Sequence, residues 1–91
     1  MLKFIETNLN FTQIKLMDKS LELNLLGERI RELRIKKGLS QAKLGLKIYK
    51  DQQSIHKVES GQFNPSYIYL LEICEGLEIS MAELFNRSFI R

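Results

Sequence analysis

Residues 40–60 read SQAKLGLKIYKDQQSIHKVES, and this stretch decides the fold of the chain. Ser40 and Asp51 each carry a side-chain oxygen that can accept a hydrogen bond from a free amide in the first turn of a helix. After each of them, apolar residues recur at helical spacing. The stretch therefore predicts two short helices joined by a tight turn, the first to about residue 48 and the second closed by Gly61.

Helical signals continue on both sides of this stretch. Upstream, apolar residues spaced by four and by three predict a helix over residues 26–37, and Gly38 suits its end because glycine readily adopts a left-handed conformation. Downstream, Asn64 followed by Pro65 is typical of a helix cap and a first helical position. The apolar residues that follow predict a fourth helix to about Leu77.

A capping-box pattern of Ser80 and Glu83 predicts a short fifth helix. The fold class is therefore all-α, a compact five-helix bundle over residues 26–86. Residues 1–25 form an N-terminal arm whose apolar residues alternate in part like a strand and in part share a helical face, so its secondary structure stays open. Because its apolar side chains exceed what a small core needs, the arm is a candidate dimerisation element. Residues 87–91 form a C-terminal tail.

The composition indicates one soluble domain. The chain has 91 residues, 44% of them hydrophobic and 27% charged, which is enough for one core and too few for two. With Cys74 as the only cysteine and a single histidine, neither an intrachain disulfide nor a four-ligand Cys/His zinc site can form, so we expect no metal and no cofactor. The N-terminus lacks the order of a secretion signal, and we expect a cytoplasmic protein without a membrane partner.

Positive charge is concentrated in the middle of the chain. The net charge is +3, but residues 1–25 are neutral, residues 26–61 carry a surplus of five positive charges, and residues 62–91 carry a net charge of minus two. A basic region between neutral and acidic flanks is the charge distribution of a surface that binds a polyanion such as DNA.

Two short helices separated by about three residues are the plan of a helix-turn-helix, whose second helix enters the major groove of DNA. In residues 40–60 that second helix, about 51–60, would expose Gln52 and Gln53 near its start and Lys57 one turn later. A glutamine amide can pair with the edge of adenine, and a lysine can donate to guanine. We therefore expect double-stranded DNA as the partner.

Five short motifs occur together along the chain: IRELR at 30–34, GLSQAKL at 38–44, SIHKVESG at 54–61, NPS at 64–66 and LF at 84–85. In this combination they resemble the lambda-repressor/Cro-type helix-turn-helix domain, also called the xenobiotic-response-element family of transcription regulators. The resemblance covers residues 26–85, about two thirds of the chain.

The resemblance implies a role for individual residues. Gln41 would bind a DNA phosphate, and residues 52–54 with Lys57 would face the groove. The expected DNA-binding residues are Gln41, Gln52, Gln53, Ser54, Lys57, Gln62 and Asn64. The resemblance also implies a largely enclosed ion pair between Arg34 and Glu59, which would tie the first helix to the end of the third.

Two residues depart from the family pattern. Tyr49 stands in the turn where the family usually has glycine, and a side chain there is costly at positive φ. We expect either that the turn is rebuilt around Tyr49 or that the left-handed backbone conformation falls on Lys50 and Asp51 instead. Asp51 caps the reading helix but, as an anion, opposes contact with phosphates.

Four further side chains are assigned from their place in the pattern. Tyr67 shares the apolar stripe of the fourth helix and is expected in the core, whereas Tyr69 is expected to be exposed. Cys74 is expected to pack in the core as a compact apolar group. His56 is expected to be a solvated surface residue.

We interpret the chain as a small, repressor-like transcription regulator that binds a palindromic operator as a homodimer. Two alternatives remain open. The chain can be the antitoxin of a toxin–antitoxin pair, with the toxin or another regulatory protein as partner, or a protein-interaction module that has lost DNA binding. No arrangement of nucleophile, base and metal is evident, so we expect that it is not an enzyme.

Overall fold

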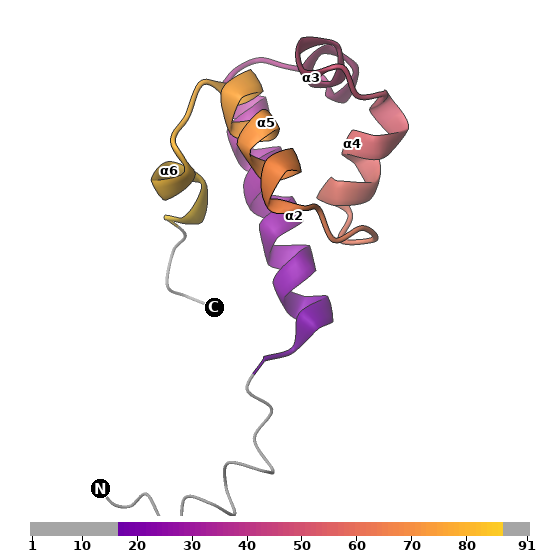
Figure 1. The fold of residues 1–91 in the computed structure, drawn as a ribbon, viewed down its shortest axis with the longest axis vertical. Helices are drawn as coiled ribbons and strands as arrows, with labels where there is room; N and C mark the ends of the chain where they lie inside the picture. The colour runs from indigo at the N-terminus through magenta and orange to yellow at the C-terminus, as the bar shows by residue number, and fades with distance from the viewer. Residues whose placement is uncertain (1–16, 87–91) are drawn as a thin grey trace, which may run out of the picture.

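The computed structural model describes residues 17–86, and this part of the chain is built from α-helices without any strand (Figure 1). The helices are α2 (Lys19–Lys36), α3 (Gln41–Ile48), α4 (Gln52–Glu59), α5 (Tyr67–Leu77) and α6 (Met81–Phe85). The all-α fold class expected from the sequence is confirmed. The first sixteen residues of the predicted N-terminal arm and the C-terminal tail lie outside the described residues.

Each helix begins after a residue whose side-chain oxygen caps it. Asp18, Ser40, Asp51, Ser66 and Ser80 each accept a hydrogen bond from the backbone amide three residues later, at 2.8–3.1 Å. Such caps satisfy amides that have no partner within the helix, and each contributes about 1 kcal/mol. The boundaries are therefore set locally, and three of the five caps follow directly from the sequence pattern.

The start of the first described helix differs from the prediction. The helix begins at Lys19, well before Leu26, because Asp18 caps it by accepting from the amide of Leu21. Leu21, Leu23 and Leu25 are therefore helical, although their alternation also allowed a strand. The last eight residues of the predicted N-terminal arm, residues 18–25, thus belong to α2 or its cap.

The start of α5 is a second correction. Ser66, not Asn64, caps this helix, and Pro65 lies buried in the preceding loop rather than at the first helical position. Tyr67 is 65% exposed and Tyr69 only 8%, so both predictions for these tyrosines are wrong.

The physical reason is the set of residues that share the buried face of α5. Tyr69, Ile73 and Leu77 follow one another at intervals of four residues, so they share one face, and all three are buried. Tyr67 stands in the first turn, where its ring projects beyond the core.

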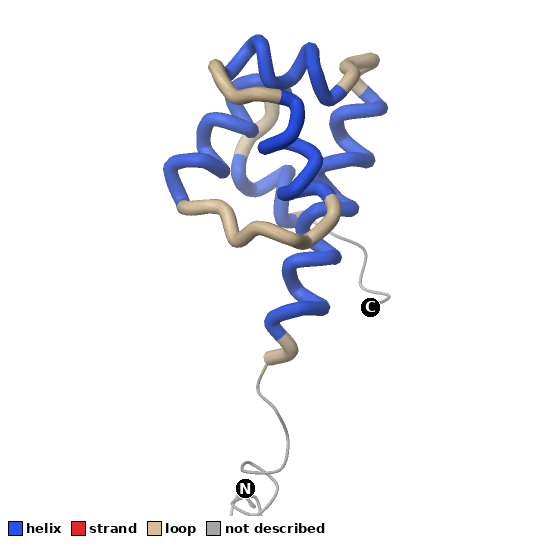
Figure 2. Tube along the Cα trace, turned by 90° about the vertical axis from the view of Figure 1, so that its right-hand side faces the viewer, coloured by secondary structure: helices blue, strands red, loops and turns tan. Residues whose placement is uncertain are grey.

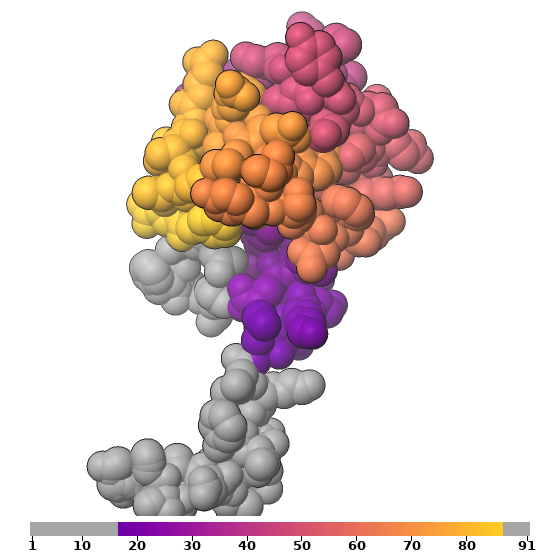
Figure 3. Space-filling model, in the orientation of Figure 1, coloured from indigo at the N-terminus to yellow at the C-terminus, as the bar shows by residue number. Residues whose placement is uncertain are grey.

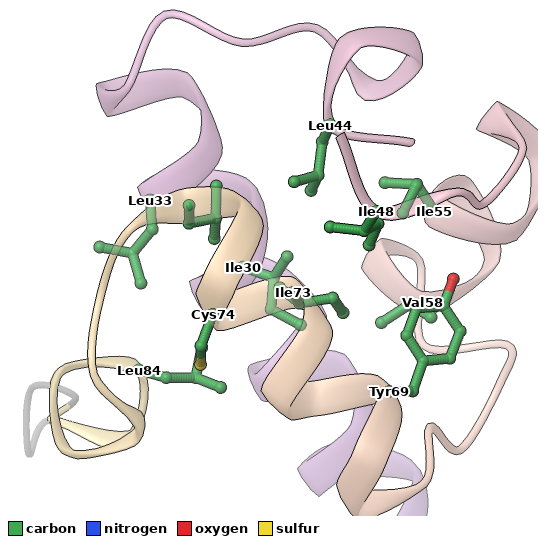
Figure 4. Close-up of a cluster of buried hydrophobic side chains, with 11 residues drawn as sticks. Ile30, Leu33, Leu44, Ile48, Ile55, Val58, Tyr69, Ile73, Cys74 and Leu84 are labelled. Atoms are coloured by element: carbon green, nitrogen blue, oxygen red, sulfur yellow. The ribbon is translucent and has the colours of Figure 1, made fainter. Parts of the chain in front are cut away.

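All five described helices contribute to one hydrophobic core (Figure 4). Its buried apolar residues are Ile30, Leu33, Leu44, Ile48, Ile55, Val58, Tyr69, Ile73, Cys74, Leu77 and Leu84. Burying a large aliphatic side chain contributes roughly 1.5–3 kcal/mol, so this shared core accounts for most of the packing energy. Cys74 lies in it as expected, and burial, followed by the nearby Glu83 carboxylate, raises the pKa of its thiol.

The short helix α6 is attached to α2 by one arginine. Arg29 donates from Nε to the carbonyl oxygen of Leu84 at 3.2 Å and from Nη2 to that of Glu83 at 2.7 Å. Carbonyls in the last turn of a helix lack partners within the helix. Arg29 bonds two of these carbonyls, of which that of Glu83 also accepts from the amide of Asn86 at 3.2 Å, while Leu84 itself is fully buried in the core.

An enclosed ion pair joins α2 to the C-terminal end of α4. Arg34 donates from Nε and Nη2 to the two carboxylate oxygens of Glu59 at 2.6 and 2.9 Å, and both residues are 7% exposed. A third donor of Arg34, Nη1, bonds the carbonyl oxygen of Leu39 at 2.8 Å. The side-chain amide of Gln41 donates to Glu59 Oε1 at 3.0 Å. The pair implied by the family resemblance is thus present, and it also holds the start of α3.

The two helices of this pair approach each other closely at Gly27. A Cβ atom at this position would lie 2.3 Å from the carbonyl oxygen of Glu59, which is far inside contact distance. Glycine is therefore required here because the backbones of α2 and α4 touch. This contact brings the end of α4, which carries Glu59, directly against α2, which carries Arg34.

The turn between α3 and α4 solves the problem of Tyr49 in a way that the sequence did not suggest. Tyr49 itself adopts the left-handed conformation, with φ 59° and ψ 42°. Both expected solutions, a rebuilt turn or a left-handed Lys50 or Asp51, are wrong. The Tyr49 side chain can project into solvent, where it is 95% exposed, so only the local backbone penalty of about 1–2 kcal/mol has to be offset.

We expect Glu59→Ala to lower the free energy of unfolding by about 3–5 kcal/mol, because it leaves the buried Arg34 charge without a partner. Urea unfolding followed by circular dichroism measures this loss. The matched control is Glu72→Ala, which removes a half-exposed ion pair with Lys50 and should cost less than about 1 kcal/mol. Equal losses in the two variants, or unchanged melting of Glu59→Ala, would contradict the role given to the buried pair.

We expect Tyr49→Gly to raise the free energy of unfolding by about 0.5–1 kcal/mol, since relief of the left-handed penalty exceeds the added entropy of the unfolded chain. Thermal melting provides the measurement. Tyr49→Ala is the control, because alanine removes the exposed ring but keeps the backbone penalty. A gain in Tyr49→Ala as large as that in Tyr49→Gly would assign the effect to the ring instead.

Candidate nucleic-acid interface

Helices α3 and α4 form a compact pair joined by the turn at residues 49–51 (Figure 1). Their facing side chains are buried: Leu44 and Ile48 from α3, and Ile55 from α4. The amide of Lys50 also bonds the carbonyl oxygen of Gly45 at 2.9 Å, which closes the end of α3. The turn therefore holds α4 at a defined angle to α3, which is the plan of a helix-turn-helix.

The outward face of α4 is polar. Gln52, Gln53, His56 and Lys57 are all exposed, as expected from the sequence, while Ile55 and other apolar positions of the helix face the core. The side chains on one face of a helix recur at intervals of three and four residues. The structure thus exposes the two glutamines and Lys57 on the outward side of α4. Helix α4 itself lies on the opposite side of the domain from α6 (Figure 1).

Ser54 differs from its neighbours because it lies partly beneath this surface. Its hydroxyl is hydrogen-bonded to the Tyr69 hydroxyl of α5. In Figure 4 the Tyr69 ring lies beside Val58, with its hydroxyl oxygen directed toward α4. Lys50 places its ammonium 4.9 Å from the centre of the same ring and 3.3 Å from Glu72 Oε1.

Tyr69 is thus a supporting residue of the candidate interface that the sequence reading missed. The signal that could have found it is its interval of four residues from Ile73, which places both on the buried face of α5. The Tyr69 hydroxyl then reaches α4, where it finds the hydrogen-bond partner that the hydroxyl of a buried tyrosine usually needs.

Gln41 stands at the first position of α3, and its side chain is half-buried. One hydrogen of its amide group is donated to Glu59. An NH₂ group has two hydrogens and the amide oxygen accepts, so the side chain retains capacity for a further ligand. The residue expected to bind phosphate is therefore oriented by the buried ion pair.

The loop between α4 and α5 carries the remaining expected site residues (Figure 2). Gln62 and Asn64 are exposed, and the Gln62 amide donates to the hydroxyl of Ser60 at 2.8 Å. Between them, Phe63 is 43% exposed and packs its ring against Tyr69 with 6.0 Å between ring centres. An aromatic side chain next to the outward face of α4 was not singled out from the sequence.

Ion pairs with acidic residues reduce the surplus of positive charge carried by residues 26–61. Lys47 lies 3.7 Å from Glu78 Oε2, and Lys50 is paired with Glu72, so acidic residues of the C-terminal third neutralise two lysines. Lys57 is exposed on the outward face of α4. Asp51 adds a negative charge at the start of this helix, where its carboxylate accepts from the amide of Ser54 at 2.8 Å.

Among residues 17–86, no group of three or more His, Cys, Asp or Glu side chains is arranged to hold a metal ion. Within the same range, no helix has both the length and the apolar character needed to cross a membrane.

Comparison with known proteins identifies the fold. The chain matches the helix-turn-helix family HTH_3 over residues 30–84. It is 33% identical over 57 residues to the uncharacterized HTH-type transcriptional regulator YgzD of Bacillus subtilis (strain 168), covering 63% of this chain and 86% of YgzD. It is 35% identical over 60 residues to the uncharacterized HTH-type transcriptional regulator y4dJ of Sinorhizobium fredii, covering 66% of this chain and 78% of y4dJ.

A solved structure extends this likeness to three dimensions. The restriction-modification controller protein C.AhdI from Aeromonas hydrophila superimposes with a TM-score of 0.73 and 39% sequence identity, over 76% of this chain and 100% of that one. The chain therefore belongs to the lambda-repressor/Cro-type helix-turn-helix family of DNA-binding transcription regulators, which is not a class of enzymes.

Proposed function

We propose that this protein is a repressor-like regulator that binds a near-palindromic operator as a homodimer, with α4 in the major groove of each half-site. The observation that carries the proposal is the outward face of α4, where two glutamines and a lysine are exposed. The Arg34–Glu59 pair and the Ser54–Tyr69 hydrogen bond hold this helix against the rest of the domain. An α-helix fits the major groove, and the first residues of a reading helix reach the base edges.

Gln52 and Gln53 are the proposed base readers at the start of α4. Each amide can donate to N7 and accept from the N6 amino group of adenine, or make equivalent contacts with other base edges. Lys57, one turn further along, is the proposed reader of guanine. Ser54, held by Tyr69, lies beneath them and can contribute its hydroxyl.

Gln41, Gln62 and Asn64 are the proposed contacts to the DNA backbone. Gln41 can give one amide hydrogen to Glu59 and the other to a phosphate, so the buried ion pair would hold the phosphate-binding group in place. Contacts of this kind set the register of the protein on DNA but carry no sequence information.

The short length of α4 supports the proposal of a second copy of the chain. Eight residues at about 1.5 Å each span only about 12 Å, which covers a few base pairs. Figure 3 shows α5 and α6 side by side on one face of the molecule, with α4 at its edge. A hollow on the α5–α6 face is lined in part by Ile68, Leu71, Ile79 and Met81, and we assign this surface to the partner copy. Two reading helices would then meet half-sites about 34 Å apart.

The likeness to C.AhdI favours one biological setting. C.AhdI is described as a controller protein of a restriction-modification system, and the match covers the whole of that chain. We propose that this chain controls the genes of such a system. A neighbouring restriction gene would support this role, whereas a neighbouring toxin gene would favour the antitoxin alternative.

We expect selection from random duplex DNA to enrich one near-palindromic motif, bound with an affinity that falls steeply with salt concentration. Gln52→Ala and Gln53→Ala should each alter preference at particular base pairs by about 1–3 kcal/mol, whereas Gln41→Ala should weaken binding to all sequences alike. Fluorescence anisotropy with single-substituted duplexes measures both effects. A flat salt dependence without an enriched motif, or uniform losses from all three variants, is the contrary result.

We expect Ile68→Glu to convert the dimer to a monomer in sedimentation equilibrium, because it places a charge within the assigned dimer surface. Ile68 is 60% exposed, so the substitution should leave folding intact. The control is Ile35→Glu at the end of α2, where an isoleucine of similar exposure, 54%, lies outside that surface. A wild-type protein that remains monomeric at high micromolar concentration would refute the dimer.

A further inference from the structure

A hollow opens beside the outward face of α4, between this helix and the loop that leads to α5. It is lined by Asp51, Gln53, Ser54, Lys57 and Phe63. Its volume is about 260 Å³, so it can admit the edge of a base. Gln53 and Lys57 are exposed at its rim, which places the hollow on the surface that we propose faces DNA.

The wall formed by Phe63 is apolar and held in place. The Phe63 ring is tilted by 57° against the ring of Tyr69, and Tyr69 is itself buried and bonded through its hydroxyl to Ser54. Phe63 nevertheless remains 43% exposed between two polar residues of the loop. When an apolar group of the DNA covers a fixed aromatic surface next to a DNA-reading helix, the burial of apolar area makes the free energy of binding more favourable.

The charges of the hollow argue against a phosphate as its occupant. Lys57 would attract a phosphate, but the Asp51 carboxylate opposes it with an equal charge. The Phe63 ring offers no hydrogen bond. A phosphate site needs a surplus of positive charge, whereas the two formal charges here cancel.

The apolar group that the major groove presents is the C5 methyl of thymine. Resting on the proposed function, we infer that this hollow receives the C5 methyl of one thymine in each half-site, packed against the ring of Phe63. Gln53 at the rim would then face the same or the neighbouring base pair. Phe63 thereby becomes a specificity-determining residue outside the reading helix.

The hydroxyl pair beneath α4 adds a polar contact beside the methyl. Ser54 and Tyr69 can bond in either direction. When Tyr69 donates to Ser54, the Ser54 hydroxyl keeps its hydrogen for an acceptor in the hollow. Thymine carries its O4 acceptor next to the C5 methyl, whereas cytosine has an N4 amino donor at that place. The hollow therefore matches both groups of the thymine edge.

The test replaces each thymine of the selected operator in turn by deoxyuridine, which removes only the C5 methyl group. For the wild-type protein, we expect one position per half-site at which Kd rises about fourfold, or about 0.8 kcal/mol for one buried methyl. Phe63→Ala should bind the thymine and deoxyuridine duplexes equally at that position. Phe85→Ala, in which a similarly exposed phenylalanine of α6 is removed, should keep the fourfold difference.

Wild-type binding that is unaffected by deoxyuridine at every position overturns the inference and leaves the proposed function standing. So does a Phe63→Ala protein that keeps the fourfold difference. If Phe63→Ala does not fold, Phe63→Gln keeps part of the packing on Tyr69 and should lose the methyl preference in the same way. Failure to select any operator overturns the proposed function, and the inference with it.

Discussion

The buried ion pair between Arg34 and Glu59 is the interaction on which the rest of the structure depends. Its two charges, both only 7% exposed, are satisfied by each other, by the Leu39 carbonyl and by the Gln41 amide. A buried charge without a partner costs several kcal/mol, so these groups must meet in one geometry or the fold fails. Because they come from α2, from the start of α3 and from the end of α4, the pair fixes how the two-helix reading unit sits on the domain.

The other end of α4 is held by different means. There the Ser54 hydroxyl meets the Tyr69 hydroxyl of α5, while Asp51 caps the first turn. The helix is thus anchored at its C-terminal end by charge and near its N-terminal end by hydrogen bonds. Groups that must meet base edges within a few tenths of an ångström need this kind of support from residues behind them. The outward side chains can then differ between relatives without any change in the scaffold.

Much of the fold follows from sequence signals that act locally. Ser40, Asp51 and Ser80 cap the helices that their positions predicted, and the polar and apolar faces of α4 follow from its spacing. The expectations that failed depend on choices between competing local signals. Asn64-Pro65 and Ser66 each make a plausible helix start, and only tertiary packing selected Ser66 and turned Tyr69 inward.

The same limit applies to the candidate site. The sequence pattern predicted that Gln52, Gln53 and Lys57 would be exposed, because exposure follows from helical periodicity. It did not predict that Tyr69 would support Ser54, or that Phe63 would line a hollow beside α4, because both contacts depend on how the loop after α4 and the start of α5 fold back against α4. Tyr49 shows a third case, in which an exposed side chain lets the backbone accept an unfavourable conformation.

The central claim, that α4 reads the major groove, is tested most directly by methylation interference. Operator duplexes are treated with dimethyl sulfate, which methylates guanine N7 in the major groove and adenine N3 in the minor groove, and are then separated into bound and free fractions. The account predicts that N7 methylation in both half-sites blocks binding and that N3 methylation there does not; interference confined to adenine N3 would contradict it.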